Sequence, residues 1–114
     1  MTKDKGSPHL SVAAPCYNEV EGIESVLEDW NKVLDGVDFS SEIVLCNDGS
    51  QDGTGPLLET LKKQFPRLVV VSFDENGGYG RALSAAVART TGEYVVTIDS
   101  DGQFDLQDGV NLLA

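Results

Sequence analysis

The chain has 114 residues, of which 40% are hydrophobic and 24% charged, as is typical of one soluble globular domain. Its formal net charge of −11 argues against binding to nucleic acid or to an anionic membrane surface, because both need clustered Lys and Arg. No apolar run approaches the roughly 20 residues that cross a bilayer, and the start of the chain lacks the apolar core of a signal peptide. We therefore expect a cytoplasmic protein with a flexible leader at residues 1–9. Its two cysteines, Cys16 and Cys46, are expected to be reduced structural thiols, although two neighbouring strand ends could bring them close.

The first part of the chain predicts a strand followed by a helix. Residues 10–14 form a short apolar run, and Pro15 is expected to end it because proline cannot donate to a ladder. The next apolar residues recur every three or four positions, as on one face of a helix, at Val20, Ile23, Leu27, Trp30 and Leu34. Trp30 is expected in the core, and Gly36 is placed to end this helix.

Three more strands are predicted along the remaining sequence. Residues 42–46 and 68–73 are apolar runs, and between them Thr54 is placed to cap a helix. Small residues at positions 82–87 predict a helix that can lie close to a sheet. Residues 95–98 are β-branched, and Gly92 and a polar turn bound them, so we expect a buried strand.

Alternating strands and helices predict a Rossmann-like three-layer α/β sandwich with a mostly parallel sheet and right-handed crossovers. The expected strand order is 3-2-1-4, with the polar loops after strands one, two and four lining one crevice. Residues 106–114 begin another helix that carries no stop signal before Ala114. We therefore expect the domain at residues 10–114 to be incomplete at its C-terminus, with an uncovered sheet edge through which two copies can pair.

Two carboxylates follow the strand at residues 95–98. Asp99 and Asp101 are two positions apart, so both side chains point to the same side before Gly102 bends the backbone. Like charges this close repel unless a cation lies between them, and carboxylate oxygens without His or Cys suit Mg²⁺ or Mn²⁺. A solvated acidic turn fits this segment equally well.

The predicted crevice also holds Glu19 and Asp48, which is too much negative charge for a phosphate site by itself. A divalent cation would bridge these carboxylates to a diphosphate. Asp48 can accept a hydrogen bond from a nucleobase, and Tyr17 offers a ring face for packing. Glu19 equally fits a simple role at the N-terminus of the first helix. The residues thus point to a metal-bound nucleoside diphosphate group.

Three motifs in this order and spacing, PCYNE, CNDGSQDGT and TIDSDGQFD, resemble the family-two glycosyltransferases of the GT-A fold. The likeness is strongest to the dolichyl- or polyprenyl-phosphate sugar synthases and the bactoprenol glucosyltransferases. It covers nearly the whole chain from Leu10. The resemblance implies a UDP- or GDP-linked sugar as donor, inverting transfer, and a lipid phosphate as acceptor in the full-length protein, at the inner face of the membrane.

The resemblance also assigns roles to individual residues. The first nucleotide-contacting loop matches Pro15, Tyr17, Asn18 and Glu19. The loop that recognises the base matches Asp48, Gly49 and Ser50. The Asp-x-Asp motif matches Asp99, Ser100 and Asp101, with Asp99, Asp101 and Gln103 as metal ligands. Arg81 lies in the Gly-rich segment where the family often places a basic residue near the phosphates.

In the family the catalytic base and the acceptor site follow the segment present here, so the resemblance implies a base beyond Ala114. We assign donor binding to this chain and expect no turnover from it alone. The alternative is a non-catalytic nucleotide-binding or interaction fragment. A dinucleotide-binding Rossmann domain is disfavoured, because Leu83 stands at the third glycine position of its fingerprint. An EF-hand loop also fails, because Val110 stands where the bidentate Glu belongs.

Overall fold

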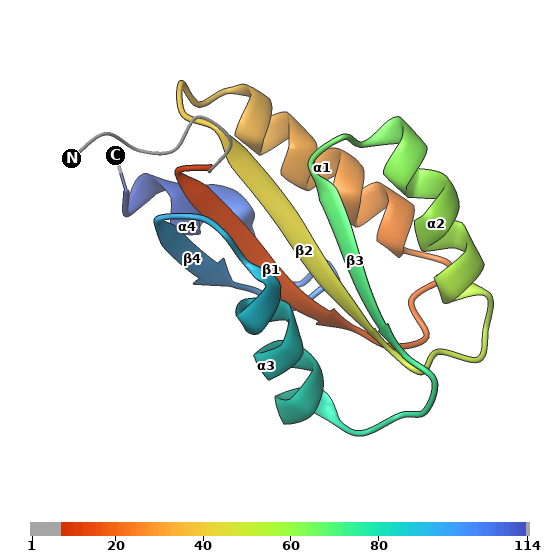
Figure 1. The fold of residues 1–114 in the computed structure, drawn as a ribbon. Coiled ribbons are helices and arrows are strands. Elements are labelled where there is room, and N and C mark those ends of the chain that lie inside the picture. Colours follow the sequence, from red (N-terminus) through yellow and green to blue (C-terminus); the bar gives the residue numbers. More distant parts are fainter. Residues whose placement is uncertain (1–7, 114) are drawn as a thin grey trace.

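The computed structural model describes residues 8–113 and shows a four-stranded parallel sheet between two layers of helices (Figure 1). The strands are β1 (Leu10–Cys16), β2 (Ser41–Asp48), β3 (Leu68–Phe73) and β4 (Tyr94–Thr97). The helices are α1 (Ile23–Asp35), α2 (Thr54–Gln64), α3 (Tyr79–Arg89) and α4 (Leu106–Asn111). The sheet order is β3-β2-β1-β4 with every pair parallel, which confirms the predicted fold class and strand order.

Two predictions fall partly outside the described residues. Of the predicted leader, residues 1–7 lie outside them, and so does Ala114, the last residue of the predicted domain. The helix predicted to run on toward Ala114 instead ends at Asn111, where a turn at Leu112 follows. The expectation of a catalytic base beyond Ala114 concerns residues that this chain does not contain, and it stays a prediction.

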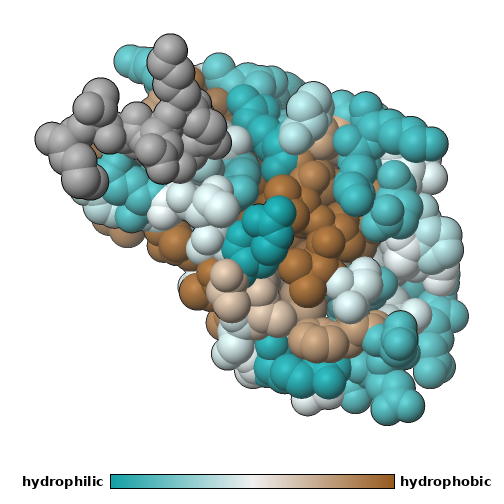
Figure 2. Space-filling model, in the orientation of Figure 1, coloured by the Kyte–Doolittle hydropathy of each residue, from teal (hydrophilic) through white to brown (hydrophobic). Residues whose placement is uncertain are grey.

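Each face of the sheet has its own apolar core. The helices α1, α2 and α4 cover one face, where Trp30 is only 3% exposed, as predicted. On the other face α3 packs on β1 and β2 through Ala82 and Ala86, whose small side chains let the helix lie close to Ala13 and Val44. One helix does not span this face, and apolar surface is visible beside α3 over β2 and β3 (Figure 2).

The first strand continues through Pro15, so the prediction that proline ends it was wrong. The carbonyl of Ala13 accepts a hydrogen bond from the Ile98 N–H at 3.1 Å, so Pro15, two residues on, also turns its backbone toward β4. The strand β4 has ended there, and no ladder bond is needed from the Pro15 nitrogen. The Pro15 carbonyl instead accepts a hydrogen bond from the Ser100 hydroxyl at 2.7 Å.

The strand β4 is not buried, which corrects the prediction for residues 95–98. Tyr94 is 47% exposed and Val95 41% exposed. The reason is position, because β4 is at the edge of the described sheet and α3 packs mainly on β1 and β2. The expected uncovered edge is therefore present, and pairing of two copies through it stays a prediction. Within residues 8–113 no helix combines the length and apolarity needed to traverse a bilayer.

The helix starts differ from the predicted ones, and side chains at these starts bond to the backbone of the neighbouring loop. The helix α1 begins at Ile23 rather than near Val20, and its end at Gly36 is as predicted. Thr54 is the first residue of α2 and not its cap, a position taken by Gly53 with φ +95°. The Thr54 hydroxyl accepts a hydrogen bond from the Glu19 N–H at 3.0 Å instead.

Candidate functional site

The loops after β1 and β2 are joined by side chain to backbone hydrogen bonds. The Asn18 N–H donates to the Ser50 hydroxyl, and the Asn18 side-chain oxygen accepts from the Gln51 N–H, both at 2.9 Å. Asn18 has a positive φ of 52°, a conformation that Asn tolerates better than most residues. Asp52 accepts from the Val20 N–H at 3.2 Å. These bonds hold the two loops side by side at the carboxyl edge of the sheet.

The loop after β4 is fixed to the same edge. The Ser100 side chain is 5% exposed, and its bond to the Pro15 carbonyl attaches the loop to β1. The Asp101 carboxylate accepts from the Gln103 N–H at 3.0 Å, which forms the turn that contains Gly102. On the other side, the Tyr79 hydroxyl donates to Oδ1 of Asp99 at 2.7 Å. This hydrogen bond, more than burial and the nearby charges, raises the pKa of Tyr79.

Together the loops enclose a pocket of about 250 Å³. It contains residues from all three motifs, with Tyr79 and Ala82 from α3, and its lining is Pro15, Cys16, Tyr17, Glu19, Asp48, Tyr79, Ala82, Asp99, Ser100 and Asp101. Asp48 and Asp101 thus face one pocket, as the predicted convergence of the loops requires. Four carboxylates line the pocket, and no Lys, Arg or His is among the described residues that do so.

The Glu19 carboxyl is the member of this group whose pKa is raised. Burial first, and then the charges of Asp101 and Asp52, raise the pKa of the Glu19 carboxyl above its usual value. A cation between Glu19 and Asp101 would remove this cost. The pocket is therefore suited to a positively charged ligand or to an anion that arrives with a cation.

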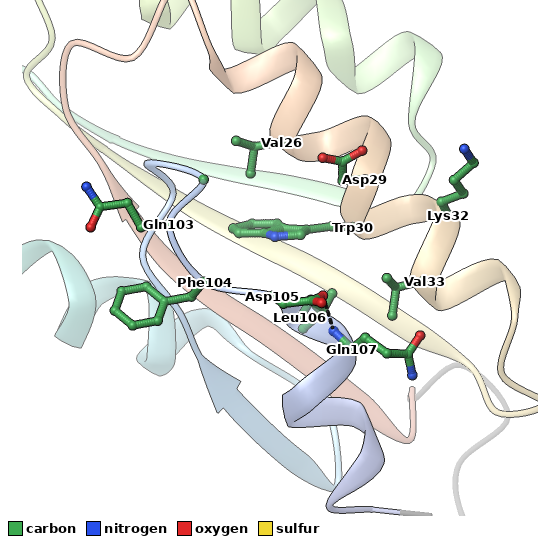
Figure 3. Close-up of a pocket in the computed structure, with 11 residues that line it drawn as sticks. Val26, Asp29, Trp30, Lys32, Val33, Gln103, Phe104, Asp105, Leu106 and Gln107 are labelled. Carbon is green, nitrogen blue, oxygen red and sulfur yellow. Dashed lines mark hydrogen bonds between the residues drawn. The ribbon is translucent and has the colours of Figure 1, made fainter.

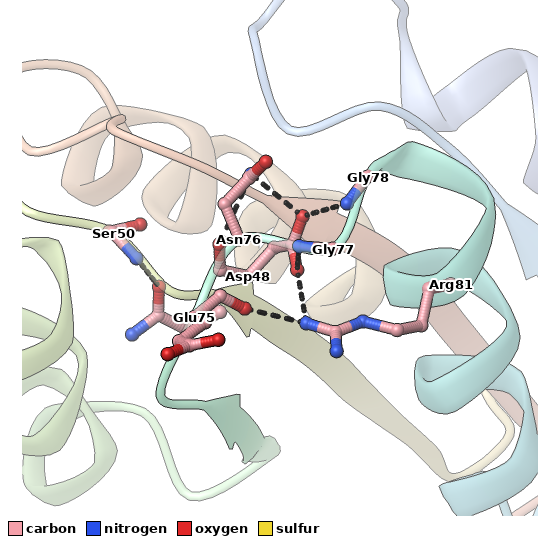
Figure 4. A network of polar contacts seen from close by, with 8 residues as sticks. Asp48, Ser50, Glu75, Asn76, Gly77, Gly78 and Arg81 are labelled. Carbon is pink, nitrogen blue, oxygen red and sulfur yellow. Dashed lines mark hydrogen bonds and ion pairs between the residues drawn. The ribbon is translucent and has the colours of Figure 1, made fainter.

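The Asp48 carboxylate is almost wholly enclosed, with 2% of the residue exposed (Figure 4). Its Oδ1 accepts from the Gly77 N–H at 3.0 Å and from the Arg81 guanidinium at 3.1 Å. Its Oδ2 accepts from the Gly78 N–H at 2.9 Å and from the Asn76 amide at 3.0 Å. Burial alone would raise the pKa of Asp48, but these donors outweigh it and hold the pKa below its usual value. Four donors fill the roughly four acceptor positions of a carboxylate.

Several predicted site residues support the pocket instead of lining it. Arg81 bonds to Asp48 and to the Glu75 carbonyl, with its guanidinium carbon 3.8 Å from the Phe73 ring centroid. Gly49 has a φ of +71°, and a Cβ there would lie 2.4 Å from the Asn76 nitrogen, so only glycine fits. Asn18 and Ser50 bond the two loops together, as described above.

Gln103 does not line the acidic pocket. It belongs to the lining of a larger hollow of about 570 Å³ between α1 and the segment 102–107, which Trp30 also lines (Figure 3). Phe104 stands at the rim of this hollow and is 59% exposed. The turn that carries Asp101 thus separates two concave surfaces, and the sequence pattern indicated only one of them.

Sequence reasoning did not predict three contacts that hold the site together. Tyr79 bonds to Asp99, Asn76 bonds to Asp48, and Asp52 accepts from the backbone of the first loop. The Asp52-x-Thr54 spacing was the one available signal, because Asp often bonds to the backbone two residues on. Tyr79 and Asn76 bond to residues more than 18 positions away in the sequence, so the local pattern predicts neither bond.

The two cysteines are free, as predicted, and they lie on opposite faces of the sheet. Pro15 is the register partner of Cys46, so Cys16 next to it points to the other side. Burial is the main cause that raises the pKa of Cys16, from 9.0 to about 12, and it also raises the pKa of Cys46.

We expect neither thiol to react with a disulfide reagent such as DTNB at pH 8 in the folded chain. Only the thiolate reacts, and the pKa of Cys16 leaves roughly 1,000-fold less of it than at the usual value. Both thiols should react at once in guanidinium chloride. Rapid labelling of two thiols in the native chain would contradict the described burial.

The fold and the pocket define an α/β domain with a hollow where ligands of such sheets usually bind, beyond the carboxyl ends of the strands. The family model of glycosyl transferase family 2 matches residues 11–109. The chain belongs to glycosyl transferase family 2.

Individual relatives agree with this family. A dolichyl-phosphate beta-glucosyltransferase of Trichomonas vaginalis is 31% identical over an alignment of 110 positions, which covers 92% of this chain and 34% of that protein. A bactoprenol glucosyl transferase of Shigella phage SfX is 34% identical over 104 residues, or 91% of this chain and 33% of that protein. The chain thus spans about a third of the length of these curated relatives.

Solved structures resemble the whole described sheet. The mannosyltransferase PcManGT from Pyrobaculum calidifontis, in complex with GDP-Man and Mn²⁺, superposes with a TM-score of 0.75 at 29% identity, covering 93% of this chain and 31% of that one. TarS of S. aureus in complex with UDP gives a TM-score of 0.70 at 29% identity, covering 91% and 31%. The GT-A fold expected from the motifs is confirmed.

Proposed function

We propose that this chain binds a nucleoside diphosphate sugar, the donor of a glycosyl transfer reaction, through a divalent cation held by Asp99 and Asp101. In this proposal Pro15, Tyr17 and Glu19 contact the nucleotide from the first loop. The second loop, with Asp48, Gly49 and Ser50, forms the base end of the pocket. The observation that carries the proposal is the lining of the pocket. It has four carboxylates at the carboxyl edge of the sheet, and no described cationic side chain is among them.

The residues present fit Mg²⁺ or Mn²⁺. Their donors are hard carboxylate oxygens, and the described lining contains no His and only a buried, protonated Cys16. Within residues 8–113 no three acidic, His or Cys side chains form a ready metal cage. This suits an ion such as Mg²⁺, which uses one or two carboxylates and completes its shell with water and phosphate oxygens. When bound, the ion would stabilise the negative charge that develops on the diphosphate as the sugar leaves.

The names of relatives support the finer parts of this proposal. PcManGT is described with GDP-Man and Mn²⁺, and TarS with UDP-GlcNAc in a further structure, so we propose a UDP- or GDP-linked sugar as ligand. The dolichyl-phosphate and bactoprenol relatives favour a lipid phosphate as acceptor for the whole protein. We assign the donor-binding step to the described residues and no catalytic base to any of them.

Calorimetric titration of the chain with UDP, GDP and their sugars, each with and without Mn²⁺, tests the proposal. We expect binding of at least one nucleotide only when Mn²⁺ is present, because the pocket's own charge repels a bare diphosphate. Release of free sugar or nucleotide in the same samples would reveal turnover, which separates a catalytic chain from a binding fragment. Binding of NAD without metal, and of no nucleotide with metal, would contradict the proposal.

A further inference from the structure

Tyr79 occupies an unusual place for a residue that is 59% exposed. It is the first residue of α3, and its hydroxyl reaches across to Oδ1 of Asp99 at 2.7 Å. Tyr79 and Asp99 line the acidic pocket and also a neighbouring hollow of about 310 Å³ beside β4. The hydrogen-bonded pair therefore forms the wall between the two spaces.

The loop that places Tyr79 is held by a buried charge. Gly78 precedes α3 with a φ of +102°, which L residues rarely adopt. The N–H groups of Gly77 and Gly78 both point at the Asp48 carboxylate, with distances of 3.0 and 2.9 Å. Since Tyr79 follows Gly78 in the chain, the Asp48 carboxylate at the end of β2 fixes the backbone position from which the Tyr79 side chain extends. A continuous set of contacts thus connects Asp48 to Asp99.

The chemistry of the phenol suits a carboxylate that must also bind a cation. A phenol hydroxyl is neutral, so it donates to Asp99 without adding a positive charge that would compete with the metal. It uses one acceptor position on Oδ1 and leaves Oδ2 without a described protein donor. Partners that orient a ligand in this way commonly contribute to metal affinity although they never touch the ion.

We propose that Tyr79 is a positioning residue that holds the Asp99 carboxylate in the orientation that binds the divalent cation, and that Asp48 sets the position of Tyr79. The inference rests on the proposed function, because it takes Asp99 as a metal ligand. It adds a residue from α3 to a site otherwise built from the three loops.

The test is the affinity for Mn²⁺ alone, measured from the signal of free Mn²⁺ in electron paramagnetic resonance spectra. We expect Tyr79→Phe to weaken Mn²⁺ binding roughly tenfold, the lower end of the range for such partners. Its melting temperature should stay that of the wild type, because the ring is exposed and only the hydroxyl is removed. The matched control is Tyr94→Phe, an exposed tyrosine at the other end of β4, which should bind Mn²⁺ as the wild type does.

A double-mutant cycle separates positioning from a general effect on the pocket. In an Asp99→Asn background, Tyr79→Phe should weaken Mn²⁺ binding no further, because its target has already lost its charge. Equal Mn²⁺ affinity in Tyr79→Phe and wild type, or full additivity in the cycle, would overturn this inference and leave the proposed function standing. A wild-type chain that binds no Mn²⁺, with or without nucleotide, would overturn both.

Discussion

Replacing Asp101 by alanine should weaken Mn²⁺-dependent nucleotide binding, with an increase in Kd on the order of 100-fold, or about 2.7 kcal/mol. Hard cations in such sites depend on one or two carboxylates, so the loss of one removes much of the protein's share of the shell. Asp101→Asn should have nearly the same effect, because it keeps the size and an acceptor for the Gln103 N–H but loses the charge. Titration calorimetry at physiological salt measures both.

Asp38→Ala is the matched control for this experiment. It removes the same charge from an exposed position in the loop between α1 and β2, at the opposite edge of the sheet. With a net charge of −11 the chain attracts any cation, and salt screens that general attraction more than a contact at a site. Equal weakening by Asp38→Ala and Asp101→Ala would show that the Mn²⁺ effect is diffuse and that Asp101 is not a ligand.

The largest effect on stability is expected from Asp48→Asn. The amide keeps the shape of the side chain but turns one of its two acceptor oxygens into a donor, which then faces the N–H groups that now bond to Asp48. Buried donors left without partners cost about 1–3 kcal/mol each, and we expect a loss of roughly 3 kcal/mol in the free energy of unfolding. At about 4 °C per kcal/mol for a domain of this size, thermal unfolding should shift down by about 12 °C. Asp74 is exposed in the loop that contains Gly77 and Gly78, so Asp74→Asn should leave the unfolding transition unchanged.

This prediction has a defined pH dependence. The pKa of Asp48 lies below its usual value of 3.8, so its ionised form stabilises the fold above that value. The contribution is lost as the pH falls through the lower pKa of the folded state. The difference in stability between wild type and Asp48→Asn should therefore be constant from pH 5 to 7 and shrink as the pH falls below about 3.8. A difference that stays the same down to pH 2 would contradict the charged network.

The local sequence pattern was enough to predict most of the helices and strands. The bounds of β3 were as predicted, and the alternation of strands and helices predicted the parallel sheet, for which the expected order 3-2-1-4 is confirmed. The pattern failed where pairing across the sheet decides the outcome. Pro15 stays in β1 because β4 has already ended beside it, and Val95 is exposed because α3 packs on other strands. Neither outcome can be predicted from the neighbouring residues in the sequence.

The convergence of the three loops was predicted, but the contacts within them were not. The turn residues after three strands were enough to predict that Glu19, Asp48 and Asp101 lie at one pocket. The saturation of Asp48 by a loop about 30 residues away was not foreseen, and neither was the bond from Tyr79 to Asp99. Asp48 can accept a base N–H only if one of its present donors moves away. The base recognition that we propose for Asp48 therefore depends on how the segment 76–81 responds to ligand.

One measurement addresses the shared cation site directly, namely the line broadening that Mn²⁺ causes in the amide spectrum of the isotope-labelled chain. If the three loops surround one ion, small additions of Mn²⁺ should broaden amides of residues 17–19, 48–50 and 99–103 at the same dose, while those of residues 36–40, at the opposite edge of the sheet, stay sharp. Broadening confined to one loop, or spread evenly over the acidic surface of α1, would contradict a common metal site.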